Sequence, residues 1–244
     1  MSKLKFILVI NLNKMKKQGK NYLKFFKREV ATLNRVREDP HENIMNVSCI
    51  FKYRHHVYII TDVSSCDLLE YITQKGLQTT DWSVHIYRQI IEGLNYLHNN
   101  LGIAHRDLKC ENVLLDHSFE KAQICDLGFA TFVPDNENLS STFCGSISYS
   151  APEIIRCEPY DPKLSDIWSV GILLFCIITG VVPFSTKHLR AISAMKCKVS
   201  IRTPGNVTVH EQLKKILYNL LRYEPKERPT LKVVRKFISK KNHF

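Results

Sequence analysis

A run of eight residues, His105–Asn112, carries side chains that can do acid–base and metal chemistry in one place. Asp107 offers a carboxylate that can orient a hydroxyl group and accept its proton. Two residues further on, Lys109 can bring a positive charge to a reacting group. Asn112 and, fourteen residues later, Asp126 offer hard oxygen atoms, which suit Mg²⁺. Any of these residues alone would be an ordinary turn former or solvated loop residue, so the pattern carries the interpretation.

Four more motifs follow this run in a fixed order. They are Asp126-Leu127-Gly128, Ala151-Pro152-Glu153, Asp166-Ile167-Trp168 and Arg228-Pro229-Thr230. Any one of them is weak evidence, but five motifs in this order with compatible gaps are very specific. Together with His105-Arg106-Asp107-Leu108-Lys109-Cys110-Glu111-Asn112 they resemble the signature set of the eukaryotic protein kinases. The resemblance covers nearly the whole chain, from about Lys3 to the end.

The resemblance implies an enzyme that transfers the γ-phosphate of ATP to Ser or Thr hydroxyls of a protein substrate, with Mg²⁺ as cofactor. Asp107, Lys109 and Asn112 are then the catalytic residues. Asn112 and Asp126 are the expected metal ligands, and Asp126 also belongs to the nucleotide site. Lys109 marks the Ser/Thr class, because Tyr kinases usually carry a different loop. ATP and a protein substrate are therefore the expected partners.

The segment Thr142-Phe143-Cys144-Gly145-Ser146 also resembles Ser/Thr kinases. Ser146 occupies the position that contacts the catalytic Asp and Lys. Arg106 marks a kinase whose loop is ordered by phosphorylation, and Thr142 is the candidate acceptor because its phosphate can pair with Arg106. An upstream kinase would be a partner. The alternative is that Thr142 is an ordinary polar loop residue.

Three residues resemble structural positions of the family. Asp166 is expected to support the catalytic-loop backbone, and Glu153 and Arg228 are expected to form a buried ion pair. The longest apolar run, Ile167–Phe184, follows Asp166 and by composition alone resembles a membrane span. In the kinase interpretation it is the buried central helix of the large lobe.

The adenine side of the nucleotide site is assigned by alignment to the strand Val57–Val63 and the residues after it. Thr61 is the expected gatekeeper. The backbone of Asp62–Ser64 is the expected hinge, so the expected cofactor-binding residues include Asp62 and Ser64, together with the ribose contact Asp67 and the pocket floor Leu114. Asp67 and Glu111 can also read basic residues of a peptide substrate; the alternative is that both are plain surface acids.

The sequence departs from the family at its N-terminal end. Its nine glycines nowhere lie closer than nine residues apart, so the Gly-rich phosphate loop is absent, and the chain is expected to begin near the third strand of the small lobe. The strand Ile7–Asn11 aligns best with the family's Val-Ala-Val-Lys strand, which places Asn11 where the phosphate-pairing Lys is expected. Glu29, assigned to the nucleotide site as the partner of that Lys, then lacks its cation. Lys14 would face the other way, because side chains alternate along a strand.

Three hypotheses follow from the combination of intact catalytic residues with an N-terminal end that departs from the family. The first is a Mg²⁺- and ATP-dependent Ser/Thr kinase, supported by the intact catalytic and metal residues. The second is a pseudokinase that acts as a binding or scaffold module, supported by Asn11 and the missing loop. The third is a truncated gene product whose upstream residues hold the missing strands. Small-molecule phosphotransferases fit less well, because they lack Ala151-Pro152-Glu153 and Arg228.

A closer resemblance is to the testis-specific serine kinase group of the calmodulin-dependent and AMP-activated-like kinases. It rests on Leu68-Leu69-Glu70, Lys109-Cys110-Glu111-Asn112, Thr142-Phe143-Cys144-Gly145-Ser146 and Asp166-Ile167-Trp168-Ser169. The resemblance implies a role in spermatogenesis.

The elements that must position these residues follow from hydrophobic periodicity. The sequence predicts an α+β, bilobal, protein-kinase-like fold with a truncated, β-rich N-lobe over residues 1–63 and a mostly helical C-lobe over residues 64–244. The expected strands are Phe6–Leu12 and a hairpin of Val47–Tyr53 with Val57–Val63. The expected helices are Asn21–Val36, Asp81–His98 with Asp81 as its cap, Ser165–Thr179, Val209–Leu221 and Leu231–Ser239.

Composition sets the broad class. The 244 residues are 44% hydrophobic and carry a formal net charge of +12, much of it near the two ends. We interpret this as a solvated basic face that suits phosphate ligands, with neither nucleic acid nor membrane as a partner. The eight cysteines form no C-x-x-C pair, as expected for reduced thiols in a cytoplasmic protein. A monomer is expected.

Overall fold

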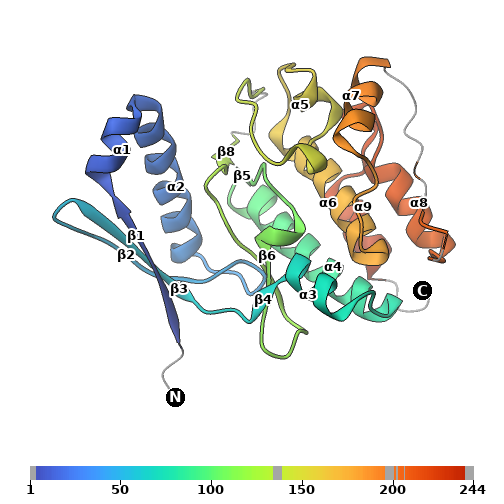
Figure 1. The fold of residues 1–244 in the computed structure, drawn as a ribbon, viewed down its shortest axis with the longest axis horizontal. Helices are drawn as coiled ribbons and strands as arrows, with labels where there is room; N and C mark the ends of the chain where they lie inside the picture. The colour runs from blue at the N-terminus through green and yellow to red at the C-terminus, as the bar shows by residue number, and fades with distance from the viewer. Residues whose placement is uncertain (1–3, 134–138, 196–200, 202, 206, 240–244) are drawn as a thin grey trace.

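A computed structural model describes residues 4–133, 139–195, 201, 203–205 and 207–239. Cys197 and the terminal basic residues Lys3, Lys240 and Lys241 lie outside these ranges. The described chain forms two lobes, a small one built on a β-sheet and a larger one built mostly of helices (Figure 1). The predicted α+β, bilobal architecture is confirmed.

The small lobe consists of one antiparallel sheet and two helices. The elements in chain order are β1 (Lys5–Asn11), α1 (Leu12–Gln18), α2 (Lys20–Glu38), β2 (Val47–Tyr53) and β3 (His56–Asp62). The strand order β1-β3-β2 leaves β1 at an edge of the described sheet. Figure 1 shows α2 lying between this sheet and the large lobe. The predicted hairpin and the predicted helix after residue 20 are both confirmed.

Amphipathic packing explains why α2 forms and where it lies. Its buried residues Phe26, Leu33 and Val36 recur at helical spacing and join the hydrophobic core. The sheet face that belongs to the same core carries Val57 and Ile59 of β3, which are 8% and 3% exposed. Thus α2 is fixed by its apolar stripe against one face of the sheet.

The large lobe contains short strands and most of the helices. Its strands are β4 (Cys66–Asp67), β5 (Ile103–Ala104), β6 (Val113–Leu115), β7 (Ala122–Ile124) and β8 (Thr131–Phe132). Its helices are α3 (Leu68–Lys75), α4 (Thr80–Asn95), α5 (Pro152–Ile155), α6 (Pro162–Thr179), α7 (Thr186–Met195), α8 (Glu211–Leu220) and α9 (Leu231–Ile238). A π-helical turn spans Tyr96–Asn100, and 3₁₀ turns span Cys110–Asn112, Ile147–Tyr149 and Pro225–Glu227.

The cap of α4 differs from the sequence prediction. The Thr79 hydroxyl accepts a hydrogen bond from the backbone N–H of Trp82 at 3.2 Å, so Thr79 caps the helix and Asp81 lies inside its first turn. Both Thr and Asp can cap a helix, and the residue that stands one position before the first helical turn takes the role.

Helix α6 is the centre of the large lobe. Its Trp168 and Phe175 are among the largest fully buried side chains. It is also the one helix of the described residues that is long and apolar enough to cross a membrane, but 83% of that stretch is buried inside the protein. The predicted core helix is therefore confirmed up to Thr179, where α6 ends; Val181 and Val182 of the same apolar run lie beyond the helix and are exposed.

Candidate active site

Helix α6 supports the backbone of the loop His105–Asn112 through Asp166. The Asp166 carboxylate is completely buried, and it accepts hydrogen bonds from the backbone N–H groups of His105 and Arg106, both at 2.8 Å. The His98 imidazole lies 2.8 Å from the same carboxylate. Arg106 has a φ of 68°, a strained value for a residue with a side chain. Asp166 therefore has the supporting position that the sequence predicts.

Two side chains and one backbone N–H group contact the Asp107 carboxylate. Lys109 Nζ lies 3.2 Å from Asp107 Oδ2, and Asn112 Nδ2 donates to the same oxygen at 3.2 Å. The other oxygen, Oδ1, accepts the backbone N–H of Ser146 at 2.8 Å, and Lys109 Nζ donates to the Ser146 hydroxyl at 3.0 Å. Asp107 is only 5% exposed. The carboxylate is thus fixed in one orientation, and Ser146 makes the two contacts expected of it.

Gly145 permits this close approach of Ser146. Its φ is 96°, and a Cβ atom there would lie 2.5 Å from the Arg106 carbonyl oxygen. No other residue type fits both the backbone conformation and the space.

A two-stranded ladder brings Asp126 to the same place. Val113 of β6 pairs with Ile124 of β7, and the Cys125 N–H donates to the Asn112 carbonyl at 3.0 Å. Asp126 follows at once with a φ of 58°, and its Oδ1 accepts the Gly128 N–H at 3.1 Å. Burial raises the pKa of the Cys125 thiol to about 12; the charges of Asp126 and Asp67 add to this effect, and Lys109 opposes it. The backbone contact between Cys125 and Asn112 therefore brings Asp126 next to the loop His105–Asn112.

The donor set of Asn112 and Asp126 fits Mg²⁺. Asn112 uses its amide nitrogen for both hydrogen bonds to Asp107, so its amide oxygen points elsewhere and is available. Asp126 adds a carboxylate with one oxygen engaged by a backbone N–H. An amide oxygen and a carboxylate are hard ligands of the type that Mg²⁺ prefers when the remaining positions go to water and phosphate.

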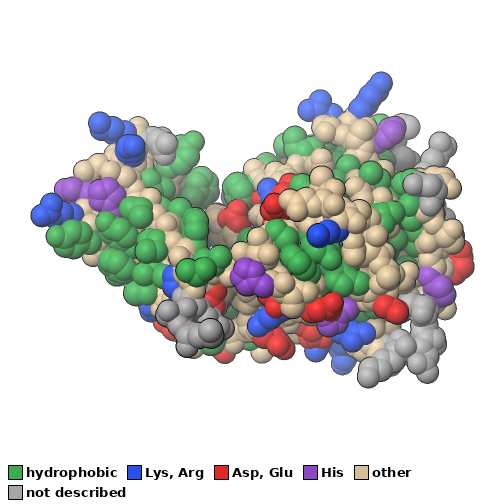
Figure 2. Space-filling model, turned by 60° about the horizontal axis from the view of Figure 1, so that its bottom comes forward, with side chains coloured by type: hydrophobic (Ala, Val, Ile, Leu, Met, Phe, Trp, Pro, Cys, Tyr) green, Lys and Arg blue, Asp and Glu red, His purple; other side chains and the backbone are tan. Residues whose placement is uncertain are grey.

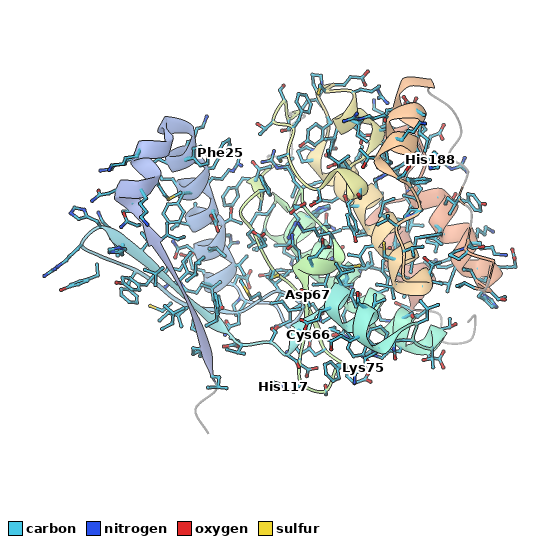
Figure 3. All side chains as sticks on the ribbon, in the orientation of Figure 1. Phe25, Cys66, Asp67, Lys75, His117 and His188 are labelled. Carbon is cyan, nitrogen blue, oxygen red and sulfur yellow. The ribbon has the colours of Figure 1, made fainter. Side chains whose placement is uncertain are left out.

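The predicted adenine-side residues line one cavity of about 350 Å³ between the lobes. Its lining includes the predicted Thr61, Asp62, Ser64, Asp67 and Leu114. Figure 3 shows Cys66 and Asp67 side by side where the chain enters the large lobe. The Asp67 carboxylate also caps α3 by accepting the Glu70 N–H at 2.8 Å.

Sequence reasoning missed other residues of this cavity. They are Phe6, Met45 and Cys66, and the cavity also contains Val63 of the predicted hinge and Glu111, which the sequence assigned to peptide recognition. Phe6 can be found from strand register, because it pairs with the gatekeeper Thr61 across β1 and β3. Cys66 stands directly before the predicted ribose contact Asp67.

The placement of Asn11 opposite Glu29 is wrong. Asn11 pairs with His56 in the ladder, its amide lies 3.1 Å from the His56 ring, and its Oδ1 caps α1 by accepting the Asn13 and Lys14 N–H groups. Paired residues in an antiparallel sheet point to the same face. Ile10, which pairs with the buried Val57, therefore lies on the face toward α2, and Asn11 lies on the opposite one. Asn was assigned to the lysine position by alignment, one residue out of register.

Glu29 has no ion-pair partner among the residues that the structure describes. It lies on α2 next to Gly128 and lines a second cavity of about 370 Å³ between α2 and the segment Thr142–Cys144, not the cavity of the adenine-side residues. Partial burial raises the pKa of the Glu29 carboxyl group, and the nearby Asp126 raises it further. The residue of β1 that lies on the face toward α2 is Ile10, not the Asn11 that the sequence predicted.

The backbone carbonyl of Thr142 contacts the Arg106 side chain. Arg106 Nη1 donates to the Thr142 carbonyl at 3.4 Å and to the Ser140 hydroxyl at 3.3 Å, while its Nε donates to the Phe129 carbonyl at 2.7 Å. Arg106 Nη2 is buried and has no hydrogen-bond partner in the described part of the chain. The Thr142 side chain is exposed.

The predicted pair of Glu153 and Arg228 is present. Both guanidinium Nη atoms donate to the Glu153 carboxylate at 2.7 Å, and both residues are 4% exposed. Arg228 also donates to the carbonyls of Leu164 and Arg222 and lies over the Trp168 ring. This pair fixes α5, next to the Thr142–Ser146 segment, to the core helix α6.

The sequence of this chain is similar to those of known protein kinases. The family described as "Protein kinase domain" matches residues 4–238. Testis-specific serine/threonine-protein kinase 4 of Homo sapiens is 32% identical over 96% of this chain and 75% of its own length. Testis-specific serine/threonine-protein kinase 1 of Mus musculus is 31% identical over 90% of this chain, which spans 60% of that relative. The probable serine/threonine-protein kinase HSL1 of Saccharomyces cerevisiae is 30% identical over 86% of the chain and 13% of its own length.

Proposed function

Because the chain belongs to the protein kinase family and resembles its serine/threonine members, we propose that it transfers the γ-phosphate of ATP to Ser or Thr hydroxyls of a protein substrate. The observation that carries this proposal is the fixed Asp107 carboxylate with Lys109, Asn112 and Ser146 around it. Maintaining a buried carboxylate in one orientation suits a group that receives a substrate hydroxyl.

The division of roles follows from the contacts. Asp107 orients the attacking hydroxyl and takes its proton, while Lys109 sits where it can offset charge on the transferring group. Asn112 and Asp126 would hold Mg²⁺, which when bound neutralises phosphate charge. The adenine and ribose of ATP would occupy the cavity lined by Thr61, Asp62, Ser64, Asp67 and Leu114.

Phosphorylation of Thr142 by an upstream kinase is part of the proposal. A phosphate on this exposed side chain would supply the acceptor that the buried Arg106 Nη2 lacks. Because Arg106 adjoins Asp107, the new pair would order the segment that carries Ser146. Thr142→Ala should then lower both activity and phosphate content, whereas an ordinary loop threonine would leave both unchanged.

A second candidate function is a nucleotide-binding or scaffold module without transfer activity. The observation that favours it is the apolar Ile10 on the face toward α2, with Glu29 lacking a cation in the described chain. A phosphate-pairing lysine is one of the parts that kinases use to place ATP.

Radiolabelled phosphate transfer to a generic basic protein tests the proposal. Asp107→Asn should reduce transfer by roughly 10²–10⁴-fold. Asp81→Asn, an exposed acid in the first turn of α4, is the matched control and should transfer as the parent does. Equal signal from the parent and Asp107→Asn would reject intrinsic activity. A thermal shift with Mg-ATP in the absence of transfer would instead support the scaffold function.

The biological setting is proposed from the relatives. The names of the human and mouse relatives describe testis-specific kinases, which supports a role in spermatogenesis. The seven described cysteines are free thiols, which supports a cytoplasmic location. Acidic groups at the cavity, Asp67 and Glu111, support a substrate with basic residues near the phosphorylated hydroxyl.

A further inference from the structure

The small lobe exposes an apolar face of its sheet. Register places Ile7, Val9 and Asn11 of β1 on the same side as Ile60, Tyr58 and His56 of β3 and Cys49, Phe51 and Tyr53 of β2. This is the face opposite Val57 and Ile59, so α2 does not cover it. Ile7 is 53% exposed, Val9 50%, Phe51 44% and Tyr53 58%. Figure 2 shows hydrophobic side chains gathered across this lobe.

Positive charge borders this outer sheet face. The first 63 residues hold thirteen Lys and Arg against five Asp and Glu, and neither residues 1–28 nor residues 43–61 contain an acid. Arg54 is exposed at the β2–β3 turn, where its guanidinium lies over the Tyr53 ring. The start of α1 is tied to this turn, because the Leu12 N–H donates to the His55 carbonyl at 2.8 Å. Helix α1 then adds the exposed Lys14, Lys16 and Lys17.

The distribution of charge argues against a second copy of this chain as the partner that covers the outer sheet face. In a two-fold dimer the same patch meets itself, so the basic residues of α1 and the β2–β3 turn would face like charges. An anionic partner gains from the same arrangement.

The exposed side chains favour a lipid surface over nucleic acid. Ile7 and Val9 are aliphatic and cannot stack on bases, which is how exposed aromatic groups bind single strands. A mixture of aliphatic, aromatic and Lys/Arg side chains on one surface is typical of proteins that lie in a membrane interface. Because β1 is an edge strand of the described sheet, its free backbone groups need water, so the contact is shallow, at the level of the headgroups.

We propose that the outer sheet face, together with the β2–β3 turn and α1, docks on the surface of an anionic phospholipid bilayer. This revises the expectation that the basic residues only form a solvated face. The cytoplasmic leaflet carries anionic lipids, so the surface would bring the kinase to that leaflet without a spanning segment. The site is independent of phosphate transfer, because none of its residues touches Asp107 or the adenine-side cavity.

Vesicle co-sedimentation of the whole chain tests the proposal. The probes are phosphatidylcholine vesicles with and without phosphatidylserine. The parent should bind the phosphatidylserine vesicles and lose binding in high salt. The turn variant Arg54→Glu should weaken binding by at least about fivefold, since a basic residue near an anionic surface is worth roughly that factor. Ile7→Thr/Val9→Thr, which keeps strand propensity, should weaken it by about tenfold.

Matched variants on the large lobe serve as controls. Lys232→Glu on α9 makes the same change in net charge as Arg54→Glu, and Val233→Thr removes an equally exposed apolar group. Both should bind as the parent does. The substitution in the β2–β3 turn disturbs no buried contact. It therefore still tests the proposal if the strand variant Ile7→Thr/Val9→Thr fails to fold.

Four results would overturn the proposal. The first is no binding to phosphatidylserine vesicles, and the second is equal binding to both vesicle types. The third is binding of a single-stranded oligonucleotide, abolished by the turn variant, without vesicle binding. The fourth is self-association in light scattering that Ile7→Thr/Val9→Thr removes, which would identify a second copy as the occupant.

Discussion

The two lobes approach the same reaction point with very different completeness. On the large-lobe side, the Asp107 carboxylate has a partner at each oxygen and the loop beneath it rests on a fully buried Asp166. On the small-lobe side, Glu29 has no cation in the described chain, and β1 is an edge strand of the described sheet. The large lobe therefore holds a connected set of buried polar groups, whereas the described part of the small lobe offers Glu29 no positive charge.

The two lobes contribute separate parts of the candidate site: the polar cluster around Asp107 in the large lobe, and the region of Glu29 and β1 in the small lobe. In the proposed kinase, buried hydrogen bonds within the large lobe would orient the substrate hydroxyl. A positive charge on β1 would help to place the nucleotide phosphates, but the side chain on the face toward α2 is Ile10. A change in one of these parts need not disturb the other. Each part can therefore be tested by substitutions confined to its own lobe.

The largest expected effect is in the large lobe, from Arg228→Ala. The change leaves the buried Glu153 carboxylate without its partner and frees the carbonyls of Leu164 and Arg222. The free energy of unfolding should fall by about 3–5 kcal/mol. Circular dichroism melts should show a decrease of roughly 10 °C. Lys214→Ala, which breaks the exposed pair with Glu211, is the control and should have little effect. An unchanged melting temperature for Arg228→Ala would show that this pair does not hold the lobe together.

Asp166→Asn should have the next largest effect. One carboxylate accepts the His105 and Arg106 N–H groups, and an amide must present N–H donors to one of them. The unsatisfied buried groups should cost about 1–3 kcal/mol of folding stability. Phosphate transfer should fall further than stability alone explains, because the strained φ of Arg106 is no longer enforced beside Asp107. Transfer measured well below the melting temperature separates the two effects; full activity there would mean that the loop holds itself.

Ile10→Lys should supply the positive charge that the small lobe lacks near Glu29 in the described chain, and so reduce the difference between the lobes. A lysine at this position lies on the face toward α2 and can pair with Glu29 and with phosphate. A charge-assisted contact of this kind should tighten Mg-ATP binding roughly tenfold. Titration calorimetry with Mg-ATP measures the change.

Asn11→Lys is the matched control for that repair. It adds the same charge one residue away on the opposite face, so Mg-ATP affinity should not change, while loss of the α1 cap should cost about 1 kcal/mol of stability. Tighter binding by Asn11→Lys and not by Ile10→Lys would restore the alignment and refute the assignment from strand register.

That pair of variants also marks the limit of sequence reasoning. The order of motifs was enough to predict the lobes, the buried pair of Glu153 and Arg228, and the meeting of Ser146 with Asp107, because each motif has a fixed local geometry. The face on which a strand residue points depends on register, and a shift of one residue reverses it. The sequence of β1 is apolar at every position from Phe6 to Ile10, so no alternation was present to set the register. The exposed outer sheet face was missed for the same reason: a continuous apolar run does not say which side is covered.

The smallest expected effect comes from Glu29→Gln, and its sign tests whether the small-lobe site is truly without a cation. The pKa of Glu29 is raised in the folded chain by burial first and then by Asp126, so the folded state holds the proton more tightly than the unfolded state. The parent therefore loses stability as pH rises from the ordinary glutamate range through the raised pKa. Glu29→Gln removes that loss: melting temperatures should match the parent below pH about 4 and exceed it at neutral pH by about 2 °C. A carboxylate that had found a cation would give the opposite result at neutral pH, with the glutamine variant less stable than the parent.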